Sequence, residues 1–225
     1  MRDDPQSIWT TGYTTQYEAV NYGANLTGFV MRKSHRLVEE PFGPEISFDK
    51  VLEVGAGAGM HIQYVRHQFS EYWMSDGSAE MLQRATAANF SRDGVITSIE
   101  DATKLSFKNE TFDRVIACHV LEHLYRPHEV LREWARVLKP GGTLSIVLPC
   151  DPGLAWRIGR HFGPRARAKK NGLDYDYTMA REHVNPINNL VYFLRYYFND
   201  LSETWWPTGL SSSDLNLIFA ANIKK

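Results

Sequence analysis

Three glycines alternate with small residues in one short segment of the chain. The segment 51–59 (VLEVGAGAG) places Gly55, Gly57 and Gly59 directly after an apolar run. Glycine has no Cβ, so a loop of this kind can turn sharply and lie close to a ligand. In open α/β folds such a loop follows the first strand and faces the ligand crevice. The segment therefore predicts a ligand-binding loop.

The spacing of the glycines and a neighbouring acid indicate what this loop can hold. The G-x-G-x-G pattern is one residue short of the dinucleotide fingerprint, G-x-G-x-x-G. Glu53 stands two residues before Gly55, at the end of the predicted strand. A carboxylate in the crevice repels a pyrophosphate and attracts an ammonium or a sulfonium group. The pattern therefore favours a cationic ligand over a dinucleotide.

Two further strand ends carry carboxylates. Asp76 lies 21 residues after Gly55, where a carboxylate can accept hydrogen bonds from both hydroxyls of a ribose. The third strand ends in Glu100, Asp101 and Ala102, which offer a carboxylate and a backbone N–H to an adenine. Three neighbouring strand ends thus predict an ammonium site, a ribose site and an adenine site, without a phosphate site. The ligand that fits them is S-adenosylmethionine.

Strands and helices alternate through the middle of the chain. Strands are predicted over 50–54, 71–75, 95–100, 112–118 and 143–148, and helices over 59–69, 78–89 and 127–138. Such alternation indicates parallel strands joined by right-handed crossovers. A helix is expected before this core at 26–40 and another after it at 187–198, whereas 150–185 has no clear periodicity. Two strands at 203–207 and 215–223 should pair antiparallel.

Five segments resemble the class I S-adenosylmethionine-dependent methyltransferases of the type 11 group. They follow one another in the family's order and spacing: VLEVGAGAG (51–59), SDGSAEML (75–82), IEDATKLSF (99–107), FDRVIACHVLEHL (112–124) and RVLKPGGTLSIVLP (136–149). The resemblance implies a Rossmann-like α/β fold. Its open sheet has seven strands, mostly parallel with an antiparallel C-terminal hairpin, and helices on both faces.

The resemblance also implies one methyltransferase domain over 1–225 and a role for each part of it. Residues 1–48 would be an N-terminal helical lid, 49–149 the cofactor-binding core, 150–200 the acceptor-binding insertion and helix, and 201–225 the hairpin. Glu53 would orient the cofactor's amino group, Asp76 would hold the ribose, and Asp101 with Ala102 would bind the adenine. The remaining cofactor-binding residues would be Gly55, Ala56, Gly57, Gly59, Gly77, Met81 and Cys118.

Histidines supply the candidates for catalysis. Methyl transfer is an in-line displacement, so the protein positions the acceptor and removes its proton where necessary. His119, at the end of the fourth strand, and His183, before the last long helix, are the two candidate bases. His119, Glu122 and His123 also form an H-x-x-E-H pattern that could hold a divalent metal. The resemblance points both ways, since some quinone-biosynthesis relatives hold a metal here, whereas the segment LEHL (121–124) is common in the family without one. We expect no metal and keep these three residues as the alternative.

Positive charge is concentrated after the fifth strand. The segment 157–170 (RIGRHFGPRARAKK) contains six Lys or Arg residues and no acid. Arginine suits bidentate contacts with phosphate. We therefore expect an anionic acceptor, either a small molecule or one linked to a glycan, phosphorylated or carried on a lipid. Methylation at oxygen in the biosynthesis of sugars or surface polysaccharide is the function that we expect, and a solvated surface run is the alternative for the segment.

Composition sets the remaining limits. The net charge of −1 gives no overall attraction to nucleic acid, and two cysteines cannot form a disulfide framework. The first residues lack the apolar core of a signal peptide, and no run is long enough to span a bilayer. We expect a cytoplasmic protein without nucleic-acid partners, as a monomer or homodimer.

Three other functions remain open at this point. One is a non-catalytic module that binds S-adenosylmethionine, and another is a methyltransferase of a phenolic or quinone-type molecule. A nicotinamide oxidoreductase is a third, although the glycine spacing and Glu53 argue against it.

Overall fold

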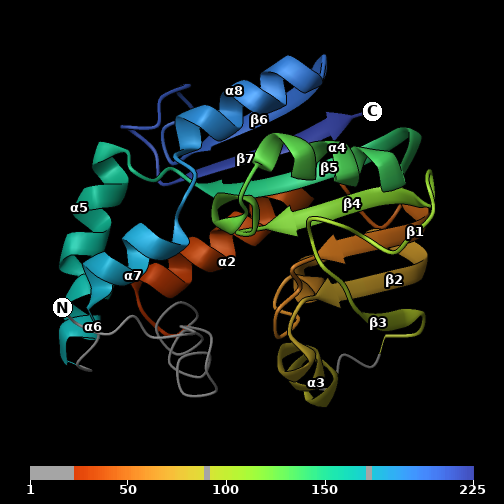
Figure 1. The fold of residues 1–225 in the computed structure, drawn as a ribbon, viewed down its shortest axis with the longest axis horizontal. Coiled ribbons are helices and arrows are strands. Elements are labelled where there is room, and N and C mark those ends of the chain that lie inside the picture. The colour runs from red at the N-terminus through yellow and green to blue at the C-terminus, as the bar shows by residue number, and fades with distance from the viewer. Residues whose placement is uncertain (1–22, 89–91, 171–173) are drawn as a thin grey trace.

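The computed structural model describes residues 23–88, 92–170 and 174–225. They form one seven-stranded sheet in the order β3-β2-β1-β4-β5-β7-β6 (Figure 1). Neighbouring strands are parallel except at β5–β7 and β7–β6, which are antiparallel. The fold expected from the sequence is therefore confirmed. The strands are β1 (Ser47–Val54), β2 (Gln68–Asp76), β3 (Val95–Ile99), β4 (Phe112–Cys118), β5 (Leu138–Pro149), β6 (Asp200–Trp206) and β7 (Ile218–Lys224).

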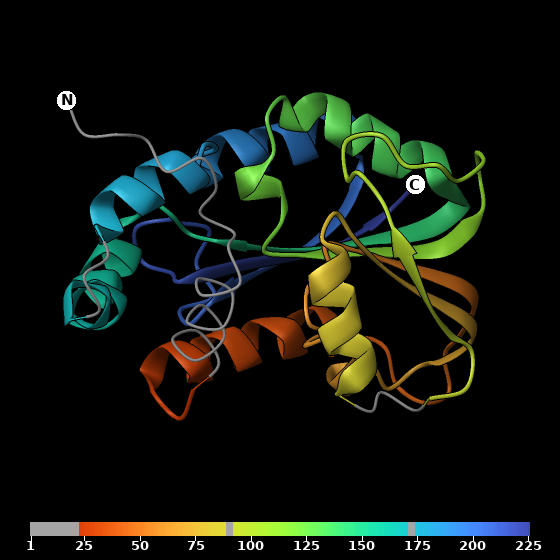
Figure 2. The same cartoon turned by 60° about the horizontal axis from the view of Figure 1, so that its bottom comes forward.

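Helices cover both faces of the sheet. On one face lie α4 (Pro127–Val137) and α8 (Ile187–Tyr197), and on the other lie α2 (Leu26–Glu39) and α3 (Ala79–Ala87) (Figure 2). Leu131, Trp134 and Leu190 are buried in one large core under α4 and α8. Each helix thus buries its apolar stripe against the sheet, which is the usual source of helix stability in a globular domain.

The helix α2 packs against the sheet and contributes to the hydrophobic core. Asn25 caps it, since its side-chain oxygen accepts a hydrogen bond from the Gly28 N–H at 3.0 Å. Val30, Leu37 and Val38 pack against apolar side chains of β5 and β7. Of the lid expected over 1–48, residues 1–22 lie outside the described residues, and α2 itself covers the sheet.

A buried ion pair fixes α2 to β4. Arg114 is fully buried, and its Nη2 lies 2.7 Å from Oε1 of Glu39. The same guanidinium donates to the Ser145 hydroxyl at 3.0 Å and lies over the ring of Phe42. Burial alone would raise the pKa of Glu39, but Arg114 and His61 together lower it to about 2. The carboxylate therefore stays charged at neutral pH.

The prediction of a helix over 59–69 is wrong. Only one 3₁₀ turn, η1 (Ile62–Tyr64), forms there, and β2 already begins at Gln68. Gly59 has φ +75°, outside the right-handed helical region. The side chains of His61 and His67 are buried. The glycine loop is thus followed by a compact turn.

The described residues of the segment without periodicity, 150–170 and 174–185, form three short helices. They are α5 (Leu154–Phe162), α6 (Pro164–Lys170) and α7 (Tyr175–Glu182). They gather at the end of the sheet to which the arrows of β1 and β4 point (Figure 1). The final strands form near the predicted positions, β6 starting three residues earlier and β7 three residues later than expected. No helix of the described residues is long and apolar enough to cross a membrane.

Candidate functional site

A cavity of about 400 Å³ opens where the strand order reverses. β1 lies between β2 and β4, so the chain leaves these strands in opposite directions and their carboxyl ends frame a crevice. The cavity is lined by the glycine loop after β1, by Asp76, Gly77 and Ser78 at the end of β2, and by Cys118, His119 and Val120 at the end of β4. This is the place where open α/β sheets bind ligands.

Asp76 shapes the loops on both sides of it. Its Oδ2 accepts a hydrogen bond from the Gly57 N–H at 2.9 Å, and its Oδ1 accepts one from the Ser78 N–H at 2.8 Å. Gly55 has φ +69°, and a Cβ there would lie 2.5 Å from a methyl carbon of Val120. The glycine is therefore required both by the backbone conformation and by the close approach of Val120, which follows β4.

Glu53 provides a buried carboxylate at the wall of this cavity. Its Oε2 accepts a hydrogen bond from the Tyr72 hydroxyl at 2.7 Å. Burial raises the pKa of Glu53, although His61 and Tyr72 act in the opposite direction. A cationic ligand beside Glu53 would compensate this desolvation and favour the charged carboxylate.

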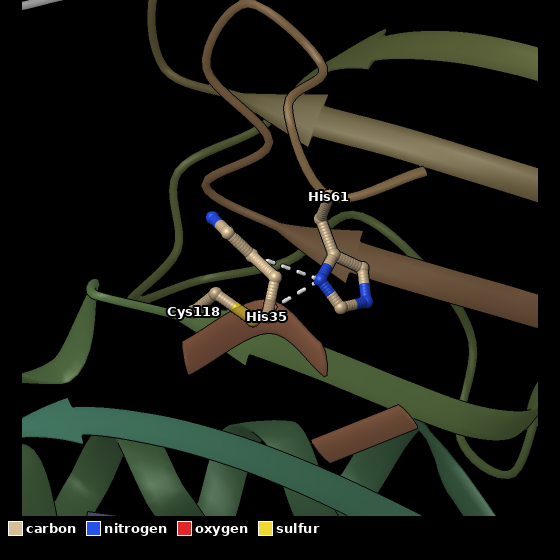
Figure 3. A group of neighbouring side chains, drawn as sticks. All are labelled: His35, His61 and Cys118. Carbon is tan, nitrogen blue, oxygen red and sulfur yellow. Dashed lines mark hydrogen bonds between the residues drawn. The ribbon is translucent and has the colours of Figure 1, made fainter. Parts of the chain in front are cut away.

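Beside Glu53, three side chains from distant parts of the chain meet. His35 of α2, His61 of the loop before η1 and Cys118 of β4 point toward one another (Figure 3). The Nδ1 of His61 lies 3.0 Å from Nδ1 of His35 and 3.5 Å from Sγ of Cys118, while its Nε2 lies 2.9 Å from Glu39. This cluster joins the cavity wall to the Glu39–Arg114 ion pair.

His119 lies at the cavity in a defined orientation. Its backbone is left-handed, with φ +58°. The hydroxyl of Ser34 donates to the Met31 carbonyl at 2.7 Å, so its oxygen accepts from Nε2–H of His119 at 2.8 Å. The other ring nitrogen, Nδ1, lies 3.7 Å from Oε1 of Glu122. His119 can therefore receive a proton at Nδ1, where a carboxylate would stabilise the imidazolium.

A second titratable cluster lies next to His119. Glu122 and His123 of η2 (Leu121–His123) meet His183 from the loop after α7, with one donor atom of each within 4.8 Å of the others. Glu122 is buried, and its Oε2 has no hydrogen-bond partner among the described residues. Nδ1 of His119 also lies 3.7 Å from Oε1 of Glu122, but the three donor atoms within 4.8 Å of one another come from Glu122, His123 and His183.

An apolar cavity of about 350 Å³ lies along α2. Thr27, Val30 and Met31 of α2 line it together with Trp156 and Ile158 of α5. Met31 is one turn from His35, which lines the first cavity, so both residues lie on one side of α2. The two cavities thus follow one another along a single helix.

Comparison with known proteins decides the family. Residues 52–146 match the sequence model of a methyltransferase domain. The chain carries a class I S-adenosylmethionine-dependent methyltransferase domain of the type 11 group. S-adenosylmethionine is the cofactor of this domain.

Two relatives and one solved structure illustrate the similarity. Over 135 residues the chain is 36% identical to a phosphatidylethanolamine N-methyltransferase of Cereibacter sphaeroides, covering 58% of this chain and 62% of that one. Over 167 residues it is 29% identical to a demethylmenaquinone methyltransferase of Corynebacterium urealyticum, covering 69% and 66%. It thus spans slightly less than two thirds of each relative's length.

A solved relative shares the fold. The phosphoethanolamine N-methyltransferase 2 of Haemonchus contortus, determined in complex with S-adenosyl-L-methionine, has a TM-score of 0.67 and 16% identity, with 97% of this chain and 58% of that chain covered. At this identity the likeness concerns the architecture of the methyltransferase domain.

Most of the residues expected to bind the cofactor line the cavity of the methyltransferase domain. Those lining it are Glu53, Gly55, Ala56, Gly57, Asp76, Gly77, Met81 and Cys118, together with the candidate base His119. The other candidate base, His183, does not line it. It stands behind His123, with 4.9 Å between the ring centroids.

Three expected cofactor residues do not line the cavity. Gly59 is buried behind the loop, where its N–H donates to the Ala56 carbonyl at 2.9 Å. Asp101 bonds the backbone and hydroxyl of Thr103, and the Ala102 carbonyl accepts from the Trp134 indole. These three residues support the loops of the methyltransferase domain, and their contact with the adenine stays a prediction.

Sequence reasoning did not single out His35, His61 or Ser34 as site residues. A signal was available for His61, which follows the glycine segment after a single methionine, and for His35, which stands four residues before Glu39. Ser34 offered no such signal, since its contact with His119 joins residues 85 positions apart.

Proposed function

We propose that this protein transfers the methyl group of S-adenosylmethionine to a hydroxyl oxygen of an anionic acceptor that carries an apolar chain. A lipid-linked, phosphorylated sugar has this chemistry. The observation that carries the proposal is the apolar cavity that follows the cofactor cavity along α2. An acceptor whose apolar chain lies in the apolar cavity would present its polar end to the cofactor cavity.

Carboxylates hold the cofactor in this proposal. Glu53 accepts from the cofactor's ammonium group, and Asp76 accepts from the ribose hydroxyls while it keeps the glycine loop in shape. Glycines 55 and 57 let the methionine part lie close to the backbone. The sulfonium needs no further activation, so binding in the correct orientation supplies most of the catalysis.

His119 removes the acceptor's proton. The acceptor oxygen forms a bond to the methyl carbon while the bond between that carbon and sulfur breaks, which leaves S-adenosylhomocysteine. The hydroxyl proton passes to Nδ1 of His119, and Glu122 stabilises the resulting charge. Ser34 keeps the ring in this tautomer through the bond to Nε2.

Charges around the apolar cavity favour an anionic head group. Arg160 lines this cavity and pairs with Asp151 at 3.4 Å, and the exposed Arg157 stands on the same helix, α5. Arg165, by contrast, pairs with Asp176. Among the described arginines of this segment, Arg157 is therefore the best candidate for contact with a phosphate.

The relatives support an acceptor with a long apolar part. Phosphatidylethanolamine and demethylmenaquinone, the compounds in the names of the two relatives, both carry such chains. The second name also favours a phenolic or quinone-type head as the alternative to a sugar. Both acceptors would use the same cavity.

A turnover assay tests the proposal. S-adenosylhomocysteine formation is measured with a polyprenyl-linked phosphosugar, the corresponding nucleotide sugar without a lipid, and a prenylated hydroquinone. We expect turnover with the first and much less with the second. Turnover with the hydroquinone alone would favour the alternative, and cofactor binding without turnover would indicate a non-catalytic module.

Two variants connect the assay to the geometry. His119→Ala should lower turnover by about 10²–10⁴-fold and leave the affinity for S-adenosylmethionine within a few-fold, because the base acts on the acceptor. Met31→Asp in the apolar cavity should raise the KM for the lipid-linked acceptor without changing cofactor affinity. If both variants keep full activity, neither the base nor the apolar cavity has the proposed role.

A further inference from the structure

The cluster of Glu122, His123 and His183 has the composition of a metal site. Two imidazoles and one carboxylate place a donor atom each within 4.8 Å of one another. This set suits first-row transition metals and leaves coordination positions open for a substrate. We propose that Glu122, His123 and His183 bind one divalent transition-metal ion beside the cofactor cavity.

The buried oxygen of Glu122 is an independent sign of a missing ligand. Glu122 is 2% exposed, and its Oε2 has no hydrogen-bond partner among the residues that the structure describes. A buried carboxylate oxygen without a partner is costly, since it has lost its water without compensation. A cation held by Glu122 together with the imidazoles would supply the missing partner.

Each histidine is also oriented by a contact on one of its nitrogens. Nδ1 of His183 lies 2.9 Å from Oδ2 of Asp151, and Nδ1 of His123 lies 2.9 Å from the Glu182 carbonyl. Metal-binding histidines characteristically make such a bond with the nitrogen that does not bind the ion. Asp151 is itself paired with Arg160, so the position of His183 is fixed from two sides.

A rigid connection brings the two ligand-bearing segments together. The side-chain amide of Asn185 donates to the carbonyls of Leu121 and Leu124 at 3.0 and 2.7 Å. These carbonyls flank Glu122 and His123, so the loop that carries His183 is tied to η2. The segment Glu182–Asn185 therefore holds His183 close to Glu122 and His123.

The other histidine cluster is a weaker candidate for a metal. In the group of His35, His61 and Cys118, Nδ1 of His61 already lies within hydrogen-bonding distance of His35 and of Cys118. No atom of that group is a buried polar atom without a partner. The contacts within the group therefore account for its arrangement without an ion.

The position of the site suggests its use, which rests on the proposed function. His123 lines the cofactor cavity, whereas His183 comes from the segment that is predicted to bind the acceptor. A metal there would bind the acceptor's hydroxyl oxygen and lower the pKa of the hydroxyl. The proton would pass to the proposed base, and the metal would keep the oxygen in line with the methyl group.

Metal binding by the full chain is the test. The protein is freed of metal by chelation and titrated with Zn²⁺ by calorimetry and with Co²⁺ by visible absorption, without acceptor. We expect one ion per chain and a spectrum without a thiolate band. His183→Ala should abolish this binding. Asp151→Asn should weaken it about 10–100-fold, because it removes the orienting carboxylate.

A matched control and a separate readout keep the test decisive. His128→Ala removes a half-buried histidine of α4 outside the cluster and should not change the titration. S-adenosylmethionine affinity, measured on the same samples, should stay within a few-fold in the His183, Asp151 and His128 variants, so failure of the metal site is distinct from failure of the proposed function. The proposal is overturned if the wild-type chain binds no ion, or if Cys118→Ser removes binding and His183→Ala does not.

Discussion

Replacing Glu39 by glutamine should destabilise the whole domain. The substitution keeps the size of the side chain and removes the charge that faces the fully buried Arg114. Loss of one partner of a buried ion pair typically costs about 3–5 kcal/mol, because the remaining charge has neither water nor a counter-ion. Since a domain is stable by only about 5–15 kcal/mol, this is a large share of the total.

The measurement is urea unfolding followed by tryptophan fluorescence. With an m-value of about 3 kcal/mol/M, the loss corresponds to a midpoint lower by roughly 1–2 M. Glu40→Gln is the matched control, since Glu40 is the next residue, is exposed, and pairs on the surface with Lys33 at 2.7 Å. A surface pair of that kind contributes about 0–1 kcal/mol.

A double variant separates charge from packing. Glu39→Met together with Arg114→Met removes both charges and should be more stable than either single variant, because no uncompensated ion is left. The reasoning would be refuted if Glu39→Gln lost less than about 1 kcal/mol, or if the two methionine substitutions simply added.

Three further perturbations test the cofactor loop and the core. Asp76→Ala should weaken S-adenosylmethionine binding tenfold or more, because a charged hydrogen bond contributes about 1.5–3 kcal/mol. The loss of affinity for a 2′-deoxyribose analogue of the cofactor, measured by calorimetry, should be smaller in this variant than in the wild type. An equal loss in both proteins would exclude the ribose contact. Gly55→Ala should lower cofactor affinity because its Cβ meets Val120, whereas Gly141→Ala, with φ +72° and open space around it, should cost stability only. Burial lowers the pKa of His67 to about 4, so the unfolded chain takes up a proton below about pH 6.5 that the folded chain refuses until about pH 4. The free energy of unfolding should therefore decrease as the pH is lowered from about 6.5 to about 4. His67→Phe should reduce this decrease by up to about 1.4 kcal/mol per pH unit. An identical pH profile in the variant would show that His67 does not titrate in this way.

The sequence pattern was sufficient for the sheet and for the cofactor loop. Apolar runs bounded by glycine and proline predicted the strands, and the glycines and acids at their ends predicted most of the cavity lining. The expected helix over 59–69 failed because tertiary contacts dominate there: His61 and His67 are drawn into the core, and β2 starts early.

Contacts between distant residues were not predictable from spacing. His183 and Glu122 seemed to belong to separate motifs, and contacts such as those of Asn185 with the Leu121 carbonyl bring them together. In the same way, the partner of Glu39 lies 75 positions away on β4. Local pattern reports which face of an element is apolar, but it does not report which polar groups of two elements will meet.

The single 3₁₀ turn after the glycine loop has a consequence for ligand choice. A long helix beginning there would direct the positive pole of its macrodipole at the ligand, and that pole is what stabilises the phosphates of a dinucleotide. Here η1 is too short to build such a field, and the amino end of α3 is already occupied by Asp76 through the Ser78 N–H. The backbone after the glycine loop therefore presents no helix terminus to a dinucleotide's phosphates, and the Asp76 carboxylate would repel them as well.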